Sequence, residues 1–297
     1  MNTEISQNFV RISQELIFTK NEKIGDLNEM PIPYNPPIPI CAYPFKGTHT
    51  FLILIYLLSK VNKDVYGKTV IVSVKEILDG VGLNSKSKDT AQRVRKSLVE
   101  LQAANIINVY KEVSVPKYVS DHFEVPKEQQ KAHLEYKEKN LKRGEFFVDI
   151  NKSLVYEFNK NCASKPFIKL PLEILSAKDL SATDKLVYII LYKLTNIRVT
   201  EKCKDFDEIV SKLRYVTTNE IAKVLGVSDR TVRRSTSKLE ELGYLAKNVT
   251  WRKDDKSYKK IGWYFPKIIF WEGEIIVADL VTSEGFKKSL EELEKSR

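Results

Sequence analysis

The stretch from Val216 to Phe265 reads VTTNEIAKVLGVSDRTVRRSTSKLEELGYLAKNVTWRKDDKSYKKIGWYF, and it decides the fold that the sequence predicts. Thr217 and Glu220 have the three-residue spacing of a capping box at a helix start. Gly226 then ends this helix, because glycine tolerates the left-handed backbone of a tight turn. Ser228, two residues after this glycine, is a good cap for another helix. The stretch therefore predicts two short helices joined by a tight turn.

The second helix, capped by Ser228 and ended by Gly243, has an apolar stripe and a cationic outer face. Val232, Leu239 and Leu242 make the stripe. Two helices around a glycine turn, with arginines on the outer face of the second, indicate a helix-turn-helix. Small or polar members of the stripe are Ser235 and Thr236, and the outward residues are Arg230, Arg233, Arg234 and Ser237.

After this helix the sequence predicts a β-hairpin with a basic tip. The segments Tyr244–Val249 and Ile261–Phe265 are expected to be its strands. A basic hairpin directly behind a helix-turn-helix indicates a wing that contacts the DNA backbone or minor groove. The cations between the expected strands are Arg252, Lys253, Lys256, Lys259 and Lys260.

Two runs of the sequence carry a resemblance to known families. The run LGVSDRTVRRSTSKLEELGYL resembles the helix-turn-helix of bacterial winged-helix DNA-binding proteins. The upstream run PFIKLPLEILSAKDLSATDKLVYIILYKLTN resembles the opening of similar domains in plasmid and phage replication proteins. The resemblance covers residues 166–265, about a third of the chain. It implies a winged helix first, and a role in replication second.

Composition points to a polyanionic partner. The 297-residue chain has a net charge of +10, and residues 214–265 hold 12 Lys or Arg against 6 Asp or Glu. No apolar run approaches the roughly 20 residues of a membrane span, and the N-terminus has no signal-peptide pattern. The three cysteines, Cys41, Cys162 and Cys203, have no metal-ligand spacing. We therefore expect a cytoplasmic protein with free thiols and no membrane contact.

The order of expected elements predicts an α+β fold, mainly helical, with two winged-helix domains in tandem. An alignment of the two halves places Leu98 on Leu239 and Leu101 on Leu242. The alternative is two unrelated helix pairs that align by chance. The expected divisions are an extended, proline-rich segment 1–48, a first winged helix 49–150 with a wing insertion 116–144, a linker helix 151–165, a second winged helix 166–270 and a C-terminal tail with a helix, 271–297.

Further candidates for DNA contact follow from this arrangement. Thr218 and Asn219, at the start of the first helix of the motif, are placed for phosphate contact. Ser228, Thr231 and Lys238 lie on the helix that would enter the major groove. The first domain's long helix is a weaker candidate, since it could instead serve a protein interface. Its candidates are Lys88, Gln92, Arg93, Arg95 and Lys96.

The sequence thus predicts a sequence-specific binder of double-stranded DNA, acting as a plasmid or phage replication initiator at origin repeats. A transcriptional regulator is the first alternative, and a non-catalytic replisome loader or protein-interaction module is the second. No phosphate-binding loop and no paired histidines occur, so we expect no enzyme activity, no cofactor and no metal. A homodimer and contacts to host replication proteins stay open as partners.

Overall fold

The computed structural model describes residues 9–13, 48–61, 69–83, 88–104, 106–110, 144–150, 167–194, 208, 216–254, 257–271, 274–277 and 283–295. The first half contains β1 (Phe9–Ser13), α2 (Thr48–Ser59), β2 (Thr69–Ser73), α3 (Val74–Gly80), α4 (Lys88–Ala103), β3 (Ile107–Tyr110) and β4 (Glu145–Ile150). The second half contains β5 (Phe167–Pro171), α8 (Leu172–Ser176), α9 (Ala182–Leu194), β6 (Val216–Thr217), α11 (Thr218–Leu225), α12 (Asp229–Glu241), β7 (Leu245–Asp254), β8 (Ser257–Pro266), β9 (Ile268–Trp271), β10 (Glu274–Val277) and α13 (Ser283–Lys295).

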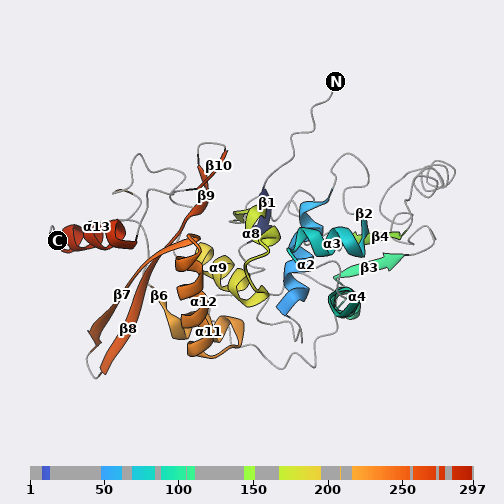
Figure 1. The fold of residues 1–297 in the computed structure, drawn as a ribbon. Helices are drawn as coiled ribbons and strands as arrows, with labels where there is room; N and C mark the ends of the chain where they lie inside the picture. Colours follow the sequence, from blue (N-terminus) through green and yellow to red (C-terminus); the bar gives the residue numbers. More distant parts are fainter. Residues whose placement is uncertain are drawn as a thin grey trace.

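The fold mixes helices and sheets, as the sequence predicts, and is elongated (Figure 1). Helices α2 and α9 lie at its centre, with the first half's sheet toward one end and the β7–β8 hairpin and α13 toward the other. The proline-rich segment, the linker at 151–165 and all but the last residue of the expected wing insertion lie outside the described residues.

Each half has a three-stranded antiparallel sheet of the same design. The strand order is β2-β4-β3 in the first half and β6-β8-β7 in the second. In each sheet the strand that comes last in the chain, β4 or β8, lies in the middle. One neighbour, β2 or β6, precedes the helix pair, and the other, β3 or β7, follows it. The order of elements expected for both halves is therefore present in the described residues.

The first helix after each edge strand begins in the same way. In α3, the Ser73 side chain accepts from the Glu76 backbone and the Glu76 carboxylate accepts from the Ser73 backbone. Thr217 and Glu220 form the same reciprocal pair at α11, as the sequence predicts. Glycines with φ of 66° and 64° follow α3 and α11 respectively. The residue after each glycine, Leu83 or Val227, donates its backbone N–H to the carbonyl oxygen five residues earlier, at 2.7 and 3.0 Å respectively.

The buried faces of α4 and α12 have the same spacing, but they align differently from the prediction. Leu101 corresponds to Leu239 by burial, and not to Leu242. The alignment predicted from the sequence was therefore wrong for this helix by nearly one turn. The buried residues are Val94, Ser97, Leu98 and Leu101 on α4, and Val232, Ser235, Thr236 and Leu239 on α12.

Leu242 was expected in the buried stripe of α12, and this expectation was wrong. Its side chain is 41% exposed, and it is the C-cap residue of the helix. Gly243, with φ of 79°, then turns the chain toward β7, as the sequence predicts. Because the helix ends at Glu241, the Leu242 side chain lies past the part of α12 that packs on α9.

The hairpin strands are longer than the sequence predicts. They continue in register through Asp254 and Ser257, so Arg252 lies opposite Lys259. We expected these cations in a loop because of their charge, but Thr250, Trp251 and Tyr258 favour extended backbone. Of the basic residues expected at the tip, Lys256 lies outside the described residues and the others are in β7 and β8.

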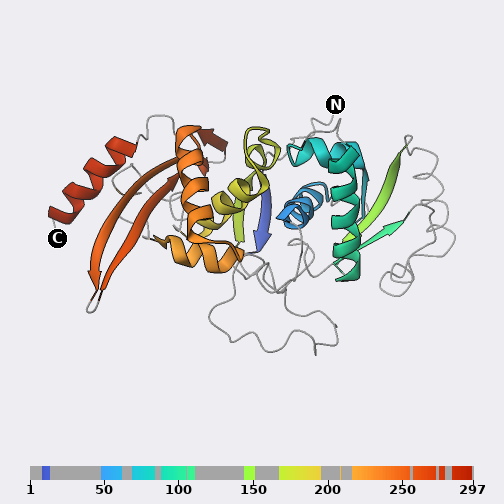
Figure 2. The same ribbon diagram turned by 60° about the horizontal axis from the view of Figure 1, so that its bottom comes forward.

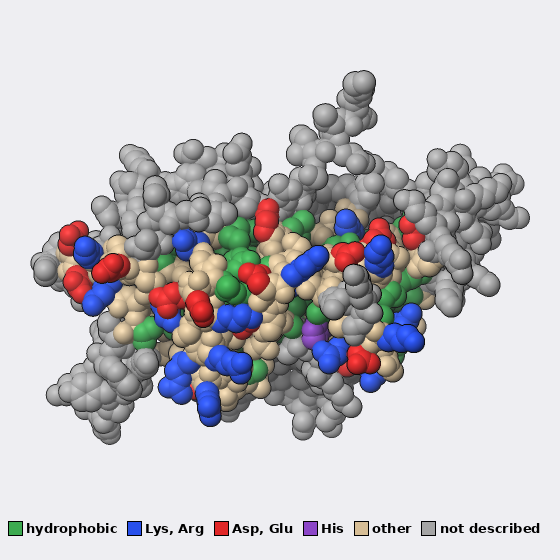
Figure 3. Space-filling model, viewed as in Figure 1, with side chains coloured by type: hydrophobic (Ala, Val, Ile, Leu, Met, Phe, Trp, Pro, Cys, Tyr) green, Lys and Arg blue, Asp and Glu red, His purple; other side chains and the backbone are tan. Residues whose placement is uncertain are grey.

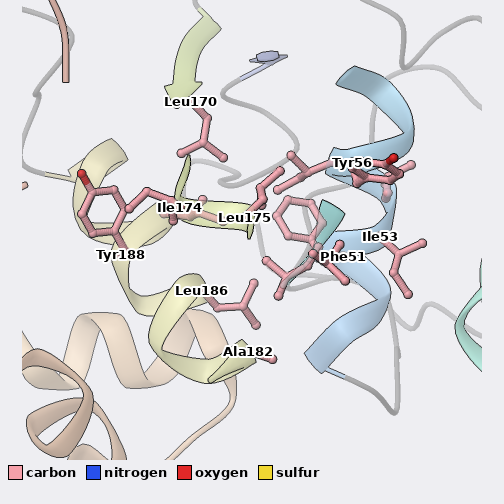
Figure 4. Packing of buried hydrophobic residues seen from close by; sticks show 14 of the residues in the cluster. Phe51, Ile53, Tyr56, Leu170, Ile174, Leu175, Ala182, Leu186 and Tyr188 are labelled. Atoms are coloured by element: carbon pink, nitrogen blue, oxygen red, sulfur yellow. The ribbon is translucent and has the colours of Figure 1, made fainter. Parts of the chain in front are cut away.

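The two halves share one hydrophobic core. Helix α2 packs against α9, and residues of both helices belong to the same cluster of buried side chains. Figure 4 shows Phe51 of α2 beside Leu175 of α8 and Leu186 of α9. The N-terminal strand β1 also pairs with β5 of the second half and contacts α2. The segment expected to be a separate extended piece, residues 1–48, therefore contributes a strand to the junction.

Helix α9 is buried on nearly every side. Residues Lys185 through Tyr192 are all buried. The reason is its central place between α2, α11, α12 and β8. Among the described helices, none is both long and apolar enough to cross a membrane.

Candidate nucleic-acid interface

Helix α12 is held on α9 by a buried carboxylate. Asp184 is 5% exposed, and its Oδ1 accepts from the Ser235 hydroxyl at 2.6 Å. Its Oδ2 accepts from the Lys238 ammonium at 3.1 Å and from the Ser181 backbone N–H at 2.9 Å. Asp184 thus caps its own helix and fixes α12 from the inner side.

The charge of Asp184 is stabilised by these contacts. Burial alone would raise the pKa of this carboxyl. Hydrogen bonds from Ser235, Ser181 and Lys238 outweigh burial and hold the pKa below its usual value of 3.8. The carboxylate is therefore ionised at neutral pH, when both of its oxygens accept hydrogen bonds.

The opposite face of α12 carries exposed cations. Arg230, Arg233 and Arg234 are exposed, and in the described part of the chain none of them has an ion-pair partner. Figure 3 shows lysine and arginine side chains gathered along the lower edge, with one group over α11 and α12 and another over α4. A guanidinium group on a groove-sized helix can bind guanine O6 and N7 or a phosphate through two hydrogen bonds.

The start of α11 is only partly available for a phosphate. Asn219 is exposed, as the predicted contact requires. Thr218 is only 8% exposed, and its hydroxyl faces Asp229 Oδ2 at 3.5 Å. The side chain of Thr218 is therefore not available for the contact expected from the sequence. Its burial follows from the packing of α11 against α12.

Ser228 and Thr231 form the first turn of α12. The Ser228 hydroxyl accepts from the Thr231 backbone at 3.2 Å, as expected for a cap, and lies 2.9 Å from the Thr231 hydroxyl. Ser228 is exposed and Thr231 is half-buried. Both therefore have a structural role at the helix start, at the end that carries Arg230.

Two further candidates on α12 already have partners. Lys238 is paired with Asp184, which draws its ammonium toward α9. Ser237 is exposed and accepts from the Lys247 ammonium at 3.0 Å. Lys247 also pairs with Glu240 at 2.8 Å, and the Glu240 carboxylate accepts from Ser283 at the start of α13. This network joins the end of α12 to β7 and α13.

The basic residues of the hairpin are paired across its two strands. Arg252 is opposite Lys259, Lys253 is opposite Tyr258, and Lys260 is opposite Trp251. Residues at one register position share a face of the ribbon, so each face of the hairpin carries cationic residues. Trp263 and Tyr264 lie further along β8, where Tyr264 is buried in the core and Trp263 packs partly buried against it.

Helix α4 presents an outer face equivalent to that of α12. When Leu101 is aligned with Leu239, Arg95 takes the place of Arg233 and Lys96 takes the place of Arg234. Figure 2 shows α4 and α12 on either side of the central helices α2 and α9. All five candidates on α4 are exposed: Lys88, Gln92, Arg93, Arg95 and Lys96.

Two structurally important residues were not identified as such from the sequence. They are Asp184 and Lys185. The partners of Asp184 are 51 and 54 residues away, so no local pattern reveals them. A signal for Lys185 did exist, since this lysine directly precedes the apolar run LVYIIL, which begins at Leu186.

Comparison with known proteins identifies the motif. Residues 205–249 match a DeoR-like helix-turn-helix domain, a range that contains α11, α12 and the start of β7. No curated protein sequence matches the chain. Among solved structures, the chain is similar to the Pi initiator protein in complex with iteron DNA, at 9% identity and a TM-score of 0.44, over 92% of this chain and 98% of that one. The second half therefore contains a helix-turn-helix domain.

Proposed function

We propose that this protein binds double-stranded DNA in a sequence-specific manner, with α12 in the major groove. The observation that carries the proposal is the exposed face of α12, whose arginines have no ion-pair partner among the described residues. The buried pair of Asp184 and Ser235 fixes the other face of the helix. A helix held in this way loses little conformational freedom on binding, which favours affinity.

The hairpin supports a second contact from the same domain. Like charges at one register position, such as Arg252 and Lys259, destabilise a ribbon unless an anion lies near them. A DNA backbone supplies that anion. Lys259→Ala should therefore weaken binding to all duplexes alike, since a phosphate contact carries no sequence information.

The first half acts, in this proposal, as a second winged helix on the same duplex. The support is the shared strand order, the matching capping boxes and the equivalent cations on α4 and α12. Because the halves share a core, the intact chain is the right material for the test. Arg95→Ala with Lys96→Ala should weaken DNA binding and reduce its salt dependence. Unchanged affinity and salt slope would favour a protein-binding role for the first half.

The recognition face is tested by selecting sites from random-sequence duplexes and measuring the affinity of variants. Arg233→Ala or Arg234→Ala should weaken binding to the selected duplex by about 5- to 150-fold if that arginine reads a base. Lys178→Ala is the matched control, because this exposed lysine lies between α8 and α9, outside the motif. Binding by both arginine variants at the wild-type level would rule out α12 as the reading helix.

Within DNA binding, a plasmid or phage replication initiator that recognises origin repeats is the role we favour. Two DNA-contacting helices in one chain suit successive grooves of a single site, and the residues around α9 resemble replication proteins. Footprinting of the protein on the DNA that flanks its own gene distinguishes an initiator from a transcriptional regulator and from a loader. Direct repeats favour an initiator, an operator over a promoter favours a transcriptional regulator, and no footprint favours a loader.

We also propose that the protein has no catalytic activity of its own. The proposal rests on the sequence, in which His122 and His133 are isolated and Asp205 and Asp207 form a DxD pair in a charged segment; all four lie outside the described residues. Purified protein with Mg²⁺ or Mn²⁺ should neither hydrolyse ATP nor nick supercoiled DNA. Nicking that a single tyrosine or aspartate substitution abolishes would refute it.

A further inference from the structure

The contact between the two halves contains a buried ammonium group. Lys185 on α9 is 1% exposed. Its Nζ donates to the Val81 carbonyl oxygen at 2.6 Å and to the Leu175 carbonyl oxygen at 2.7 Å. Val81 is the C-cap of α3 in the first half, and Leu175 lies in the last turn of α8 in the second. One side chain therefore connects the ends of two helices from different halves.

Gly82 closes the same contact. A Cβ atom at this position would lie 2.5 Å from the Ala177 carbonyl oxygen and 2.7 Å from both the Ser176 carbonyl oxygen and Lys185 Nζ. The φ of Gly82 is also positive, at 66°. No side chain fits there, so the turn after α3 lies directly on the end of α8. We call Val81, Gly82, Leu175 and Lys185 the interdomain joint.

The lysine of the joint is charged at neutral pH, although its burial disfavours the charge. Carbonyl groups at helix C-termini carry partial negative charge, and a buried ammonium needs such partners. Burial lowers the pKa of Lys185 to about 8, while the charges of Asp179 and Asp184 act to raise it. At neutral pH the group is therefore still protonated and donates to both carbonyls.

The joint also lies one residue from the anchor of α12. Asp184 binds Ser235 of α12, and the next residue, Lys185, binds the end of α3. Helix α3 packs in turn on α4. The positions of both candidate DNA-contacting helices thus depend on contacts made by a single turn of α9.

We propose that the interdomain joint sets the distance and angle between α4 and α12, and so the spacing between the two DNA contacts. The effect on helix geometry follows from the joint alone. The effect on DNA spacing rests on the proposed function. Lys185 is a positioning residue in this proposal, since it is buried and touches no DNA.

The geometry is tested without DNA by measuring a distance between spin labels. Ala103→Cys and Glu241→Cys place labels at exposed, equivalent positions near the ends of α4 and α12, in a chain whose three natural cysteines are serine. We expect one narrow distance distribution in the parent and in the control Lys178→Met. Lys185→Met should shift or broaden it. An unchanged distribution in the folded Lys185→Met protein overturns the proposal.

A second variant keeps the test decisive if Lys185→Met does not fold cooperatively. Gly82→Ala keeps the lysine, but its Cβ would crowd the carbonyl oxygens at the end of α8 and Lys185 Nζ, so it should also shift or broaden the distribution. The same distribution as in the parent would overturn the proposal.

The consequence for DNA is tested on the duplex recovered by selection, with base pairs inserted between the two protected segments. Wild type should lose about tenfold in affinity on insertion, because a fixed spacing forbids simultaneous contact. Lys185→Met should lose less than about threefold, since its halves adapt. Equal losses would overturn the spacing role. If wild type binds no duplex, the proposed function fails, while the label distances still decide whether the joint sets the geometry.

Discussion

Replacing Asp184 by asparagine should loosen α12 from α9 while the shape of the side chain is kept. The buried hydrogen bond from Ser235, at 2.6 Å, is made to a charged group, and such bonds contribute about 1.5–3 kcal/mol. The pair with Lys238 adds about 0.2–1 kcal/mol, because the lysine side chain is 39% exposed and solvent screens it. We therefore expect Asp184→Asn to lower the free energy of unfolding by about 2–4 kcal/mol.

The pH dependence of this loss follows from the direction of the pKa shift. The pKa of Asp184 in the folded protein lies below its usual value of 3.8, so the unfolded chain binds more protons near that pH. The stabilisation is complete above about pH 5 and is lost as the pH falls through the folded value. Asparagine does not titrate. The difference in unfolding free energy between wild type and Asp184→Asn should therefore be flat from about pH 5 to 8 and shrink below about pH 4.

Urea unfolding of a double-mutant cycle provides the measurement. Asp184→Asn, Ser235→Ala and the double variant should give a coupling energy of about 1.5–3 kcal/mol. The control is Asp179→Asn, an exposed carboxylate that accepts from the Tyr244 hydroxyl at 3.1 Å, and it should cost less than about 1 kcal/mol. A coupling energy under about 0.5 kcal/mol, the usual error of additivity, would refute the argument that Asp184 anchors α12.

DNA binding by the same variant separates positioning from contact. Asp184 lies on the inner side of α12 and touches no phosphate in the proposed complex. Asp184→Asn should therefore weaken binding to the selected duplex, while the slope of log affinity against log salt concentration stays at the wild-type value. A reduced slope would mean that cations on α12 had lost phosphate contacts.

Three further predictions concern stability and are checked by urea unfolding. Because the pKa of Lys185 is lowered from 10.5 to about 8, the unfolded chain binds more protons between these pH values, so the stability of wild type relative to Lys185→Met should rise by about 3 kcal/mol over that range. Gly226→Ala should cost about 1–2 kcal/mol for its positive φ, since nothing lies within 4 Å of the added Cβ, and Gly82→Ala should cost more because carbonyl oxygens crowd that site. Leu239→Ala should cost about 2–5 kcal/mol, whereas exposed Leu242→Ala should cost less than about 1 kcal/mol.

Local signals in the sequence predicted local structure well. The capping box of Thr217 and Glu220 and the turn at Gly226 involve residues within a few positions of one another, and both are present. Periodicity failed at Leu242 for a physical reason. A residue three positions after Leu239 lies near the same side of a helix, so the pattern alone does not show whether the helix continues that far.

Long-range contacts had no such signal. The bond from Lys185 to Val81 joins residues 104 positions apart, and the bond from Ser235 to Asp184 joins residues 51 apart. A lysine within an apolar helix indicates an internal polar partner, since an unpaired buried ammonium is too costly. The sequence does not say which carbonyls accept from it, because that depends on how the two halves pack.

The repeat shows how a physical constraint corrects a sequence alignment. The capping boxes align Ser73 with Thr217, and the buried faces of the next helices align Leu101 with Leu239. The chain between these two landmarks is longer in the first half, so no single ungapped alignment satisfies both.

The ungapped alignment predicted from the sequence has an offset between those of the capping boxes and the buried faces. It still pairs leucine with leucine, because a shift of three residues along a helix nearly preserves the face on which a residue lies. It would place Arg95 on buried Thr236. The alignment set by burial places Arg95 on exposed Arg233 instead, so it brings the cations of the two helices into equivalent positions.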